Sequence, residues 1–150
     1  QQKTVFDGTK GYSEGMGQRA DFTGEQIEEM KDNSLHGMLT YDERGFKYEL
    51  TGMENINGKD AYKITFTSPA GKKSLAYYAV DSGLLIRTSS SVSTSQGTFN
   101  QTTDMDDYRE VQGVKYPFKL SQNMGPQSIE LIVTSYEINT GLPDSLFEIK

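Results

Sequence analysis

Residues 57–87, NGKDAYKITFTSPAGKKSLAYYAVDSGLLIR, decide the fold. The stretch opens on Asn57-Gly58, the dipeptide that most readily supplies the two positive φ angles of a tight hairpin turn. Alternating large and small or polar side chains then predict two strands. Their expected inward rows are Tyr62, Ile64 and Phe66, followed by Leu75, Tyr77 and Ala79. Turn residues at 68–71 and 81–83 end these strands, and a third strand begins at Leu84. The stretch predicts an antiparallel meander and contains no catalytic motif.

Strand patterns continue on both sides of this meander, at 45–51, 89–95, 114–124 and 129–138. Segment 89–95 is almost all Ser, Thr and Val; it also fits a low-complexity linker, but its β-branched residues favour an exposed strand. Segment 114–124 has the apolar row Tyr116, Phe118 and Leu120. Segment 129–138 is apolar on both faces, so we expect it at the centre of the sheet. The spacing predicts an antiparallel sheet of about eight to ten strands.

One helix is expected, and it begins after Thr23. Thr23 and Gln26 match the T-x-x-Q capping box, while Phe22 and Ile27 match a hydrophobic staple. The first turns carry acidic residues, which the helix dipole favours at that end. Ile27 and Met30 give the helix only a narrow apolar stripe. We therefore expect a short helix that ends near residue 33 and packs on the sheet.

The length, net charge and composition of the chain limit the classes of protein to which it could belong. At 150 residues the chain fits a single domain, 1–150. A net charge of −6 argues against nucleic acid or an anionic bilayer as the main partner, because both need a basic surface. The chain has no cysteine, which excludes disulfides and thiolate metal sites. No apolar run approaches the roughly 20 residues of a membrane-spanning helix. The chain begins with Gln1 rather than Met, and we interpret this as a processed or cloned start.

Few residues suggest chemistry. His36 is the only histidine, and we interpret it as a structural residue beside the end of the helix. The densest acidic cluster is Asp104, Asp106, Asp107 and Glu110. Its spacing lacks the glycine and distal glutamate of an EF-hand loop, so a solvated strand end is favoured over a metal site or a hydrolase. No nucleotide, hydrolase or zinc-peptidase motif is found. We expect no enzyme activity, no cofactor and no metal.

The expected rows of alternating aromatic and aliphatic residues form a broad apolar face. One short helix with a narrow stripe is too small to cover such a face, so a ligand, a partner or further sequence is expected to do so. The candidate ligand-binding residues are those of the three rows: Tyr62, Ile64, Phe66, Leu75, Tyr77, Tyr116, Phe118 and Leu120. Tyrosines at strand spacing are also common in cores, and this alternative stays open.

A set of short phrases in the chain resembles a known family. The phrases are Tyr77-Tyr78, Asp81-Ser82-Gly83-Leu84, Asp107-Tyr108-Arg109, Gly113-Val114-Lys115-Tyr116-Pro117 and Asp144-Ser145-Leu146-Phe147. In this order they resemble the periplasmic lipoprotein-sorting carriers of the LolA and LolB type. The Bacteroidetes versions are the most similar, and some of these occur at the end of insulinase-type zinc peptidase chains. The likeness covers residues 55–150 well and 1–54 more loosely.

The resemblance implies a half-barrel, a strongly curved antiparallel sheet that holds acyl chains on its concave face. The family's N-terminal helix and first strands would precede Gln1, so we expect one wall of the half-barrel to be missing here. The implied function is a non-enzymatic module of the bacterial envelope, in the periplasm, that binds a lipid or lipidated protein. The alternative is an accessory domain of a larger envelope protein, such as an insulinase-type peptidase, with no ligand of its own. A second copy or the rest of a parent chain is a further expected partner, through an exposed strand edge.

Overall fold

The computed structural model describes residues 2–15, 17–32, 34, 37, 39–94 and 97–149. His36 and residue 33 lie outside these ranges, so the interpretations placed on them stay predictions. By internal packing the chain divides into two compact units. One combines residues 1–43 with 137–150, and the other comprises Arg44–Tyr136. Each unit is described by itself below, so the expected packing of the helix on the large sheet also stays a prediction.

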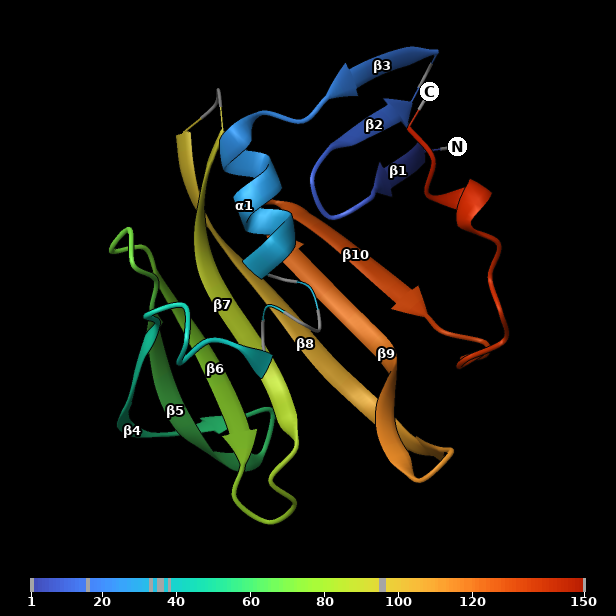
Figure 1. Cartoon of the computed structure of the whole chain (residues 1–150). Helices are drawn as coiled ribbons and strands as arrows, with labels where there is room; N and C mark the ends of the chain where they lie inside the picture. The colour runs from blue at the N-terminus through green and yellow to red at the C-terminus, as the bar shows by residue number, and fades with distance from the viewer. Residues whose placement is uncertain are drawn as a thin grey trace. The chain divides into compact units, whose positions relative to one another are not determined.

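In its described residues the smaller unit contains a three-stranded antiparallel sheet, the α-helix α1 and a short 3-10 helix (Figure 1). The elements are β1 (Gln2–Phe6), β2 (Gly11–Gly15), β3 (Gln18–Asp21), α1 (Gly24–Asp32) and η1 (Asp144–Leu146). Val5 lies opposite Tyr12 between β1 and β2, and both side chains are buried. The turn before β2 is held by Asp7, whose Oδ1 accepts hydrogen bonds from the backbone N–H groups of Thr9 and Lys10.

The capping box of α1 is confirmed. Thr23 donates its backbone N–H to Gln26 Oε1 at 2.9 Å, and Gln26 donates its backbone N–H to Thr23 Oγ1 at 3.4 Å. These reciprocal bonds satisfy two donors that a helix start leaves free. Ile27 and Met30 are only half-buried, as a narrow stripe implies.

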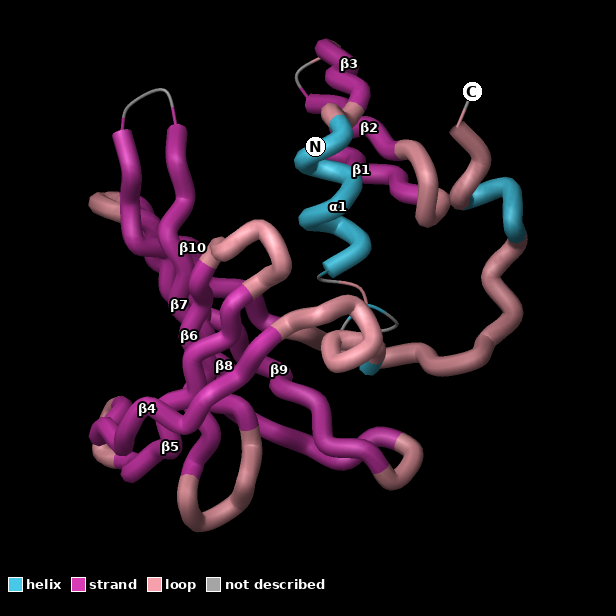
Figure 2. The backbone as a smooth tube through the Cα atoms, turned by 60° about the vertical axis from the view of Figure 1, so that its left-hand side comes forward, coloured by secondary structure: helices cyan, strands magenta, loops and turns pink. Residues whose placement is uncertain are grey.

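The larger unit is a seven-stranded antiparallel sheet with the strand order β10-β9-β8-β7-β6-β5-β4 (Figures 1 and 2). Every neighbour in space is thus a neighbour in sequence. The strands are β4 (Lys47–Ile56), β5 (Lys59–Thr67), β6 (Lys73–Ala79), β7 (Leu85–Thr94), β8 (Gly97–Val111), β9 (Val114–Met124) and β10 (Gln127–Ile132). The sheet is open and not closed into a barrel. The expected fold class, mainly β with a large antiparallel sheet, is confirmed; the ten strands divide between two sheets.

One of two expectations about strands is confirmed, and the other is wrong. The Ser- and Thr-rich segment is a strand, because β7 runs to Thr94 in register with β8. The last strand, in contrast, is not central. β10 ends at Ile132 and pairs only with β9, at the edge of the sheet. Its side chains are apolar on both faces, but all six residues are exposed, so the apolar content does not reflect burial there.

The hairpin turn at residues 57 and 58 is confirmed. Asn57 has a φ of 50° and Gly58 a φ of 86°, the two positive angles of a type I′ turn between β4 and β5. Gly58 donates its backbone N–H to Asn55 Oδ1 at 3.0 Å. The turn joining β8 to β9 repeats this geometry at Gln112 and Gly113, with φ values of 52° and 82°.

Replacing Gly58 with alanine should lower the free energy of unfolding by about 1–2 kcal/mol, because a side chain disfavours the left-handed conformation. Space is not the cause, since a Cβ at Gly58 would have no neighbour within 4 Å. Gly24→Ala is the matched control: this glycine lies at the start of α1 without a positive φ, so the same change should be neutral or stabilising. Urea denaturation measures both, and equal losses would contradict the assignment to the turn.

Continuous register lets each residue of the large sheet be assigned to a face. One row crosses all seven strands as Leu50, Ile64, Ala76, Thr88, Thr103, Gln122 and Ile129. The adjacent row crosses as Gly52, Lys63, Tyr77, Arg87, Asp104, Ser121 and Glu130. We call the face of the first row the apolar face and that of the second row the charged face. The two names are used in this sense throughout.

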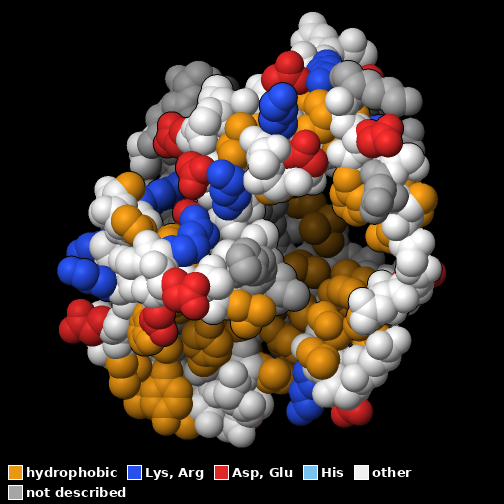
Figure 3. Space-filling view, in the orientation of Figure 1, with side chains coloured by type: hydrophobic (Ala, Val, Ile, Leu, Met, Phe, Trp, Pro, Cys, Tyr) orange, Lys and Arg blue, Asp and Glu red, His pale blue; other side chains and the backbone are white. Residues whose placement is uncertain are grey.

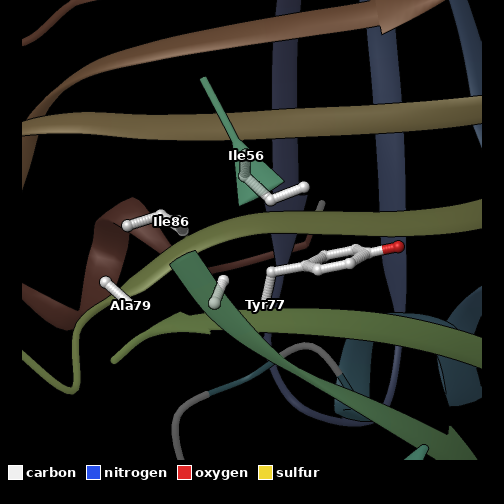
Figure 4. Packing of buried hydrophobic residues seen from close by; sticks show 5 residues of the cluster. Ile56, Tyr77, Ala79 and Ile86 are labelled. Atoms are coloured by element: carbon white, nitrogen blue, oxygen red, sulfur yellow. The ribbon is translucent and has the colours of Figure 1, made fainter. Parts of the chain in front are cut away.

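The main buried cluster lies on the charged face. It consists of Ile56, Ala61, Tyr77, Ala79 and Ile86, with Leu75 packed against it (Figure 4). The β4–β5 turn closes over this cluster. Asn57 contacts Asp104 of β8, and Lys59 forms an ion pair with Asp106 at 3.7 Å. Because β6 and β7 lie between β5 and β8, these contacts show that the sheet curls toward its charged face at this end.

Candidate functional site

The apolar face carries large side chains that stay open to solvent. At one end of the sheet Tyr48, Leu50, Met53 and Tyr62, from β4 and β5, are 57%, 60%, 58% and 40% exposed; we call these four the β4–β5 patch. At the opposite edge Ile129 and Leu131 of β10 are each about half exposed on the same face. Figure 3 shows apolar side chains gathered over both ends. Apolar side chains grouped in this way are typical of a binding surface rather than of random exposure.

Six of the eight candidate ligand-binding residues lie on the apolar face. They are Tyr62, Ile64, Phe66, Tyr116, Phe118 and Leu120. The expected grouping is wrong for Leu75 and Tyr77, which lie on the charged face. Tyr62 is opposite Tyr78, and Lys63 is opposite Tyr77. A register change of one residue moves a whole row to the other face, and the turn at 68–72 sets that register.

The exposed residues of β4 were not among the candidates. Tyr48 and Leu50 alternate with charged residues, so the same period of two that marked β5 was available for them. The register adds Met53, because a bulge between Leu50 and Gly52 shifts the alternation by one residue. The ring of Tyr48 lies 6.1 Å from that of Phe66, its partner on β5.

Around Phe118 of β9, the apolar face is covered by other side chains of the larger unit. Phe118 is buried, and the ring of Tyr136 lies 5.2 Å from it and 4.8 Å from Tyr116. Tyr136 donates its hydroxyl to the carbonyl of Pro117 at 2.7 Å. The Arg109 guanidinium lies 4.5 Å from the centre of the Phe118 ring. Phe118 is therefore covered, whereas the side chains of the β4–β5 patch are exposed.

The charged face carries ion pairs across neighbouring strands. Glu54 pairs with Lys63 at 2.5 Å, and Lys119 pairs with Glu130 at 2.8 Å. Tyr77 lies beside the first pair; burial and the nearby Glu54 carboxylate raise its pKa. Arg87 donates Nε and Nη2 to the two carboxylate oxygens of Asp104, the second at 2.7 Å. This bidentate pair is half-buried, with side chains 25% and 21% exposed.

The acidic cluster of the sequence is not one site. Asp104 is held by Arg87 in the middle of β8 rather than at a solvated strand end, so that expectation is wrong for this residue. Asp106 faces Lys59, and Asp107 pairs with Arg109 at 2.5 Å. Over the described part of the chain, no group of three or more acidic, His or Cys side chains could hold a metal ion. Among these same residues, no helix has the length and hydropathy that spanning a bilayer requires.

Lowering the pH should weaken the larger unit through Asp104. The hydrogen bond from Arg87 holds the pKa of Asp104 below its ordinary value of 3.8. The unfolded chain therefore takes up the proton first, and stability that is present above pH 3.8 is lost as the pH falls through the lower folded-state pKa. Asp104→Asn should cost about 1–3 kcal/mol at pH 7, because it leaves Arg87 without its charged partner.

Urea denaturation from pH 7 to pH 3 gives the free energies of unfolding of wild type and Asp104→Asn. The difference between them reports on this carboxylate, because other acids with lowered pKa values, such as Glu54, are present in both proteins. We expect that difference to shrink toward zero at the acid end. A difference that stays constant over the whole range would contradict the role given to the Arg87–Asp104 pair.

Three solved structures have a similar fold. A DUF1329 family protein from Desulfovibrio piger aligns with a TM-score of 0.61 and 16% identity over 93% of this chain. A putative outer membrane lipoprotein-sorting protein domain from Vibrio parahaemolyticus aligns with a TM-score of 0.60 and 13% identity over 92%. A LolA superfamily protein from Nitrosomonas europaea aligns with a TM-score of 0.54 and 14% identity over 99%. The chain has a LolA-like fold.

The LolA-like fold confirms the resemblance seen in the sequence. No family model matches the chain, and no curated protein matches it. At identities of 13–16% the solved structures support the fold alone. This LolA-like chain spans 62% and 63% of the lengths of the first two structures and 70% of the third.

Proposed function

We propose that this chain is a non-enzymatic module of the bacterial cell envelope that binds a lipid, or the acyl chain of a lipidated protein, on its apolar face. The proposal places it in the periplasm. The observation that carries it is the β4–β5 patch, four large apolar side chains on neighbouring strands that are all at least 40% exposed. The names of two structural neighbours, a lipoprotein-sorting domain and a LolA superfamily protein, also support binding of a lipid or a lipidated protein.

An acyl chain suits such a patch for a physical reason. Each CH₂ group removed from water contributes about 0.8 kcal/mol, and an alkyl chain needs no hydrogen-bond partner. The alternating rows of a pleated sheet offer parallel grooves between side chains of one face. The charged face offers no such surface, because the apolar side chains of its main cluster are buried against one another and its charged side chains form ion pairs. The apolar face is therefore the side on which we place the ligand. The resemblance implied the concave face, but the sheet curls toward its charged face at the β4–β5 turn, so the proposed site lies on the opposite, convex side there.

Uptake of a fluorescent fatty acid, followed by titration, tests the proposal together with native mass spectrometry of the purified chain. We expect saturable binding and a bound lipid mass that is lost in organic solvent. A folded chain that is empty in every preparation and takes up no probe would contradict lipid binding. It would favour the alternative, an interaction domain of a larger envelope protein. Association with a peptidase is part of that alternative and stays a prediction.

A further inference from the structure

Strand β10 is an edge strand of the seven-stranded sheet, and within Arg44–Tyr136 no other strand pairs with its outer side. Its sequence QSIELI pairs with β9 on one side only, and all six residues are exposed. Ile129 and Leu131 lie on its apolar side, and Ile132, which is 62% exposed, lies on the other. Exposed apolar edge strands are templates for pairing with another chain.

The opposite edge of the sheet is protected by features that β10 lacks. β4 contains a bulge between Leu50 and Gly52 and the charged residues Lys47, Glu49 and Glu54. Bulges and charges are the devices by which natural sheets block edge pairing. β10 has regular pairing with β9 from Gln127 to Ile132 and a single charge, Glu130, which Lys119 neutralises at 2.8 Å. Of the two edges, β10 is the one suited to accept a strand.

The register shows which backbone groups are free to pair. Val133 donates its N–H to the carbonyl of Phe118 at 2.8 Å, which continues the β9–β10 register by one residue. In an antiparallel ladder the hydrogen-bonded positions alternate, so the odd-numbered residues of β10 bond to β9. The N–H and C=O groups of Ser128, Glu130 and Ile132 therefore point away from the sheet.

We propose that β10 pairs with β10 of a second copy, antiparallel and centred on Ile129. In this register Ser128 of each copy lies opposite Glu130 of the other, and the two residues exchange backbone hydrogen bonds. Each carboxylate then faces a hydroxyl, whereas centring on Glu130 would place two carboxylates directly opposite each other, which is destabilising. Opposed residues share a face, so the two apolar faces become one continuous surface. The proposal does not depend on lipid binding.

A cysteine scan tests the register, since the chain has no cysteine of its own. At the centre of the pairing, Ile129→Cys places two thiols within the Cα separation of about 4.4–6.8 Å that a disulfide needs. Leu131→Cys is the control: residues 131 of the two copies are four positions out of register, roughly 13 Å apart along the strand. Under mild oxidation we expect covalent dimers from Ile129→Cys and few from Leu131→Cys. Equal cross-linking of the two, or none in either, would overturn the pairing.

Sedimentation equilibrium of the unmodified chain gives the second test. We expect a reversible species of twice the 16.8 kDa of one chain. Ser128→Pro removes an N–H that points away from β9, so the fold should persist while the dissociation constant rises about tenfold or more. Ser128→Ala keeps that N–H and should associate as the wild type does. Wild-type association in a folded Ser128→Pro chain, or a monomeric wild type at high concentration, would exclude the interface even if fatty acid binds.

Discussion

Replacing Ile86 with alanine should lower the free energy of unfolding of the larger unit by about 2–5 kcal/mol, the range found for buried Ile-to-Ala changes. Ile86 is 7% exposed and packs in the cluster with Ile56, Ala61, Tyr77 and Ala79. The fully buried Ala61 leaves little room for neighbours to move into the vacated space. The measurement is the midpoint and slope of a urea transition followed by circular dichroism.

Ile132→Ala is the matched control for this change. Ile132 is 62% exposed, so the same loss of side chain should change stability by no more than about 0.5 kcal/mol. A small loss at Ile86, similar to that at Ile132, would mean that the cluster on the charged face is not the stabilising core of this unit. A large loss at Ile86 alone would locate the core away from the apolar face, which leaves that face available for a ligand.

The double substitution Leu50→Lys with Met53→Lys should weaken binding of the fluorescent fatty acid by about tenfold or more, because two apolar side chains of the proposed site become charged. The fold should survive, since both residues are more than half exposed. Titration of the same probe into wild type and variant measures the effect.

A matched control separates contact from net charge. Glu49→Lys changes the net charge by +2, as the double substitution does, but Glu49 lies on the charged face of the same strand. Its affinity for the probe should stay within about twofold of wild type, because surface charges screened by salt act weakly at a distance. If the double variant is folded and binds as wild type does, or if Glu49→Lys weakens binding equally, the β4–β5 patch is not the site.

The local parts of the structure followed from the sequence because their causes lie within a few residues. The turn at Asn57 and Gly58 and the capping box at Thr23 and Gln26 both formed as expected. Such features depend on side chains and φ angles that neighbours in the chain supply. The phrases shared with the LolA-type carriers are mostly turn signals, so they indicated the fold but said little about activity.

The candidate site was predicted only in part because it depends on register between strands. Alternation assigned Tyr62 and Tyr77 to inward rows but could not show that they lie on opposite faces. Apolar content suggested that the last strand is central, yet β10 is an edge. Charge clustering suggested that Asp104 is solvated, yet it is paired with Arg87, seventeen residues away in sequence.

By itself, the sequence determined most strands of the large sheet, their turns and the LolA-like class, since each is specified by alternation and turn chemistry along a short stretch of chain. Only the tertiary structure decided which rows share a face, where the core lies and which edge is open. The physical reason is that strand pairing has a period of two: one residue gained or lost in a turn or a bulge moves every following side chain to the other side of the sheet.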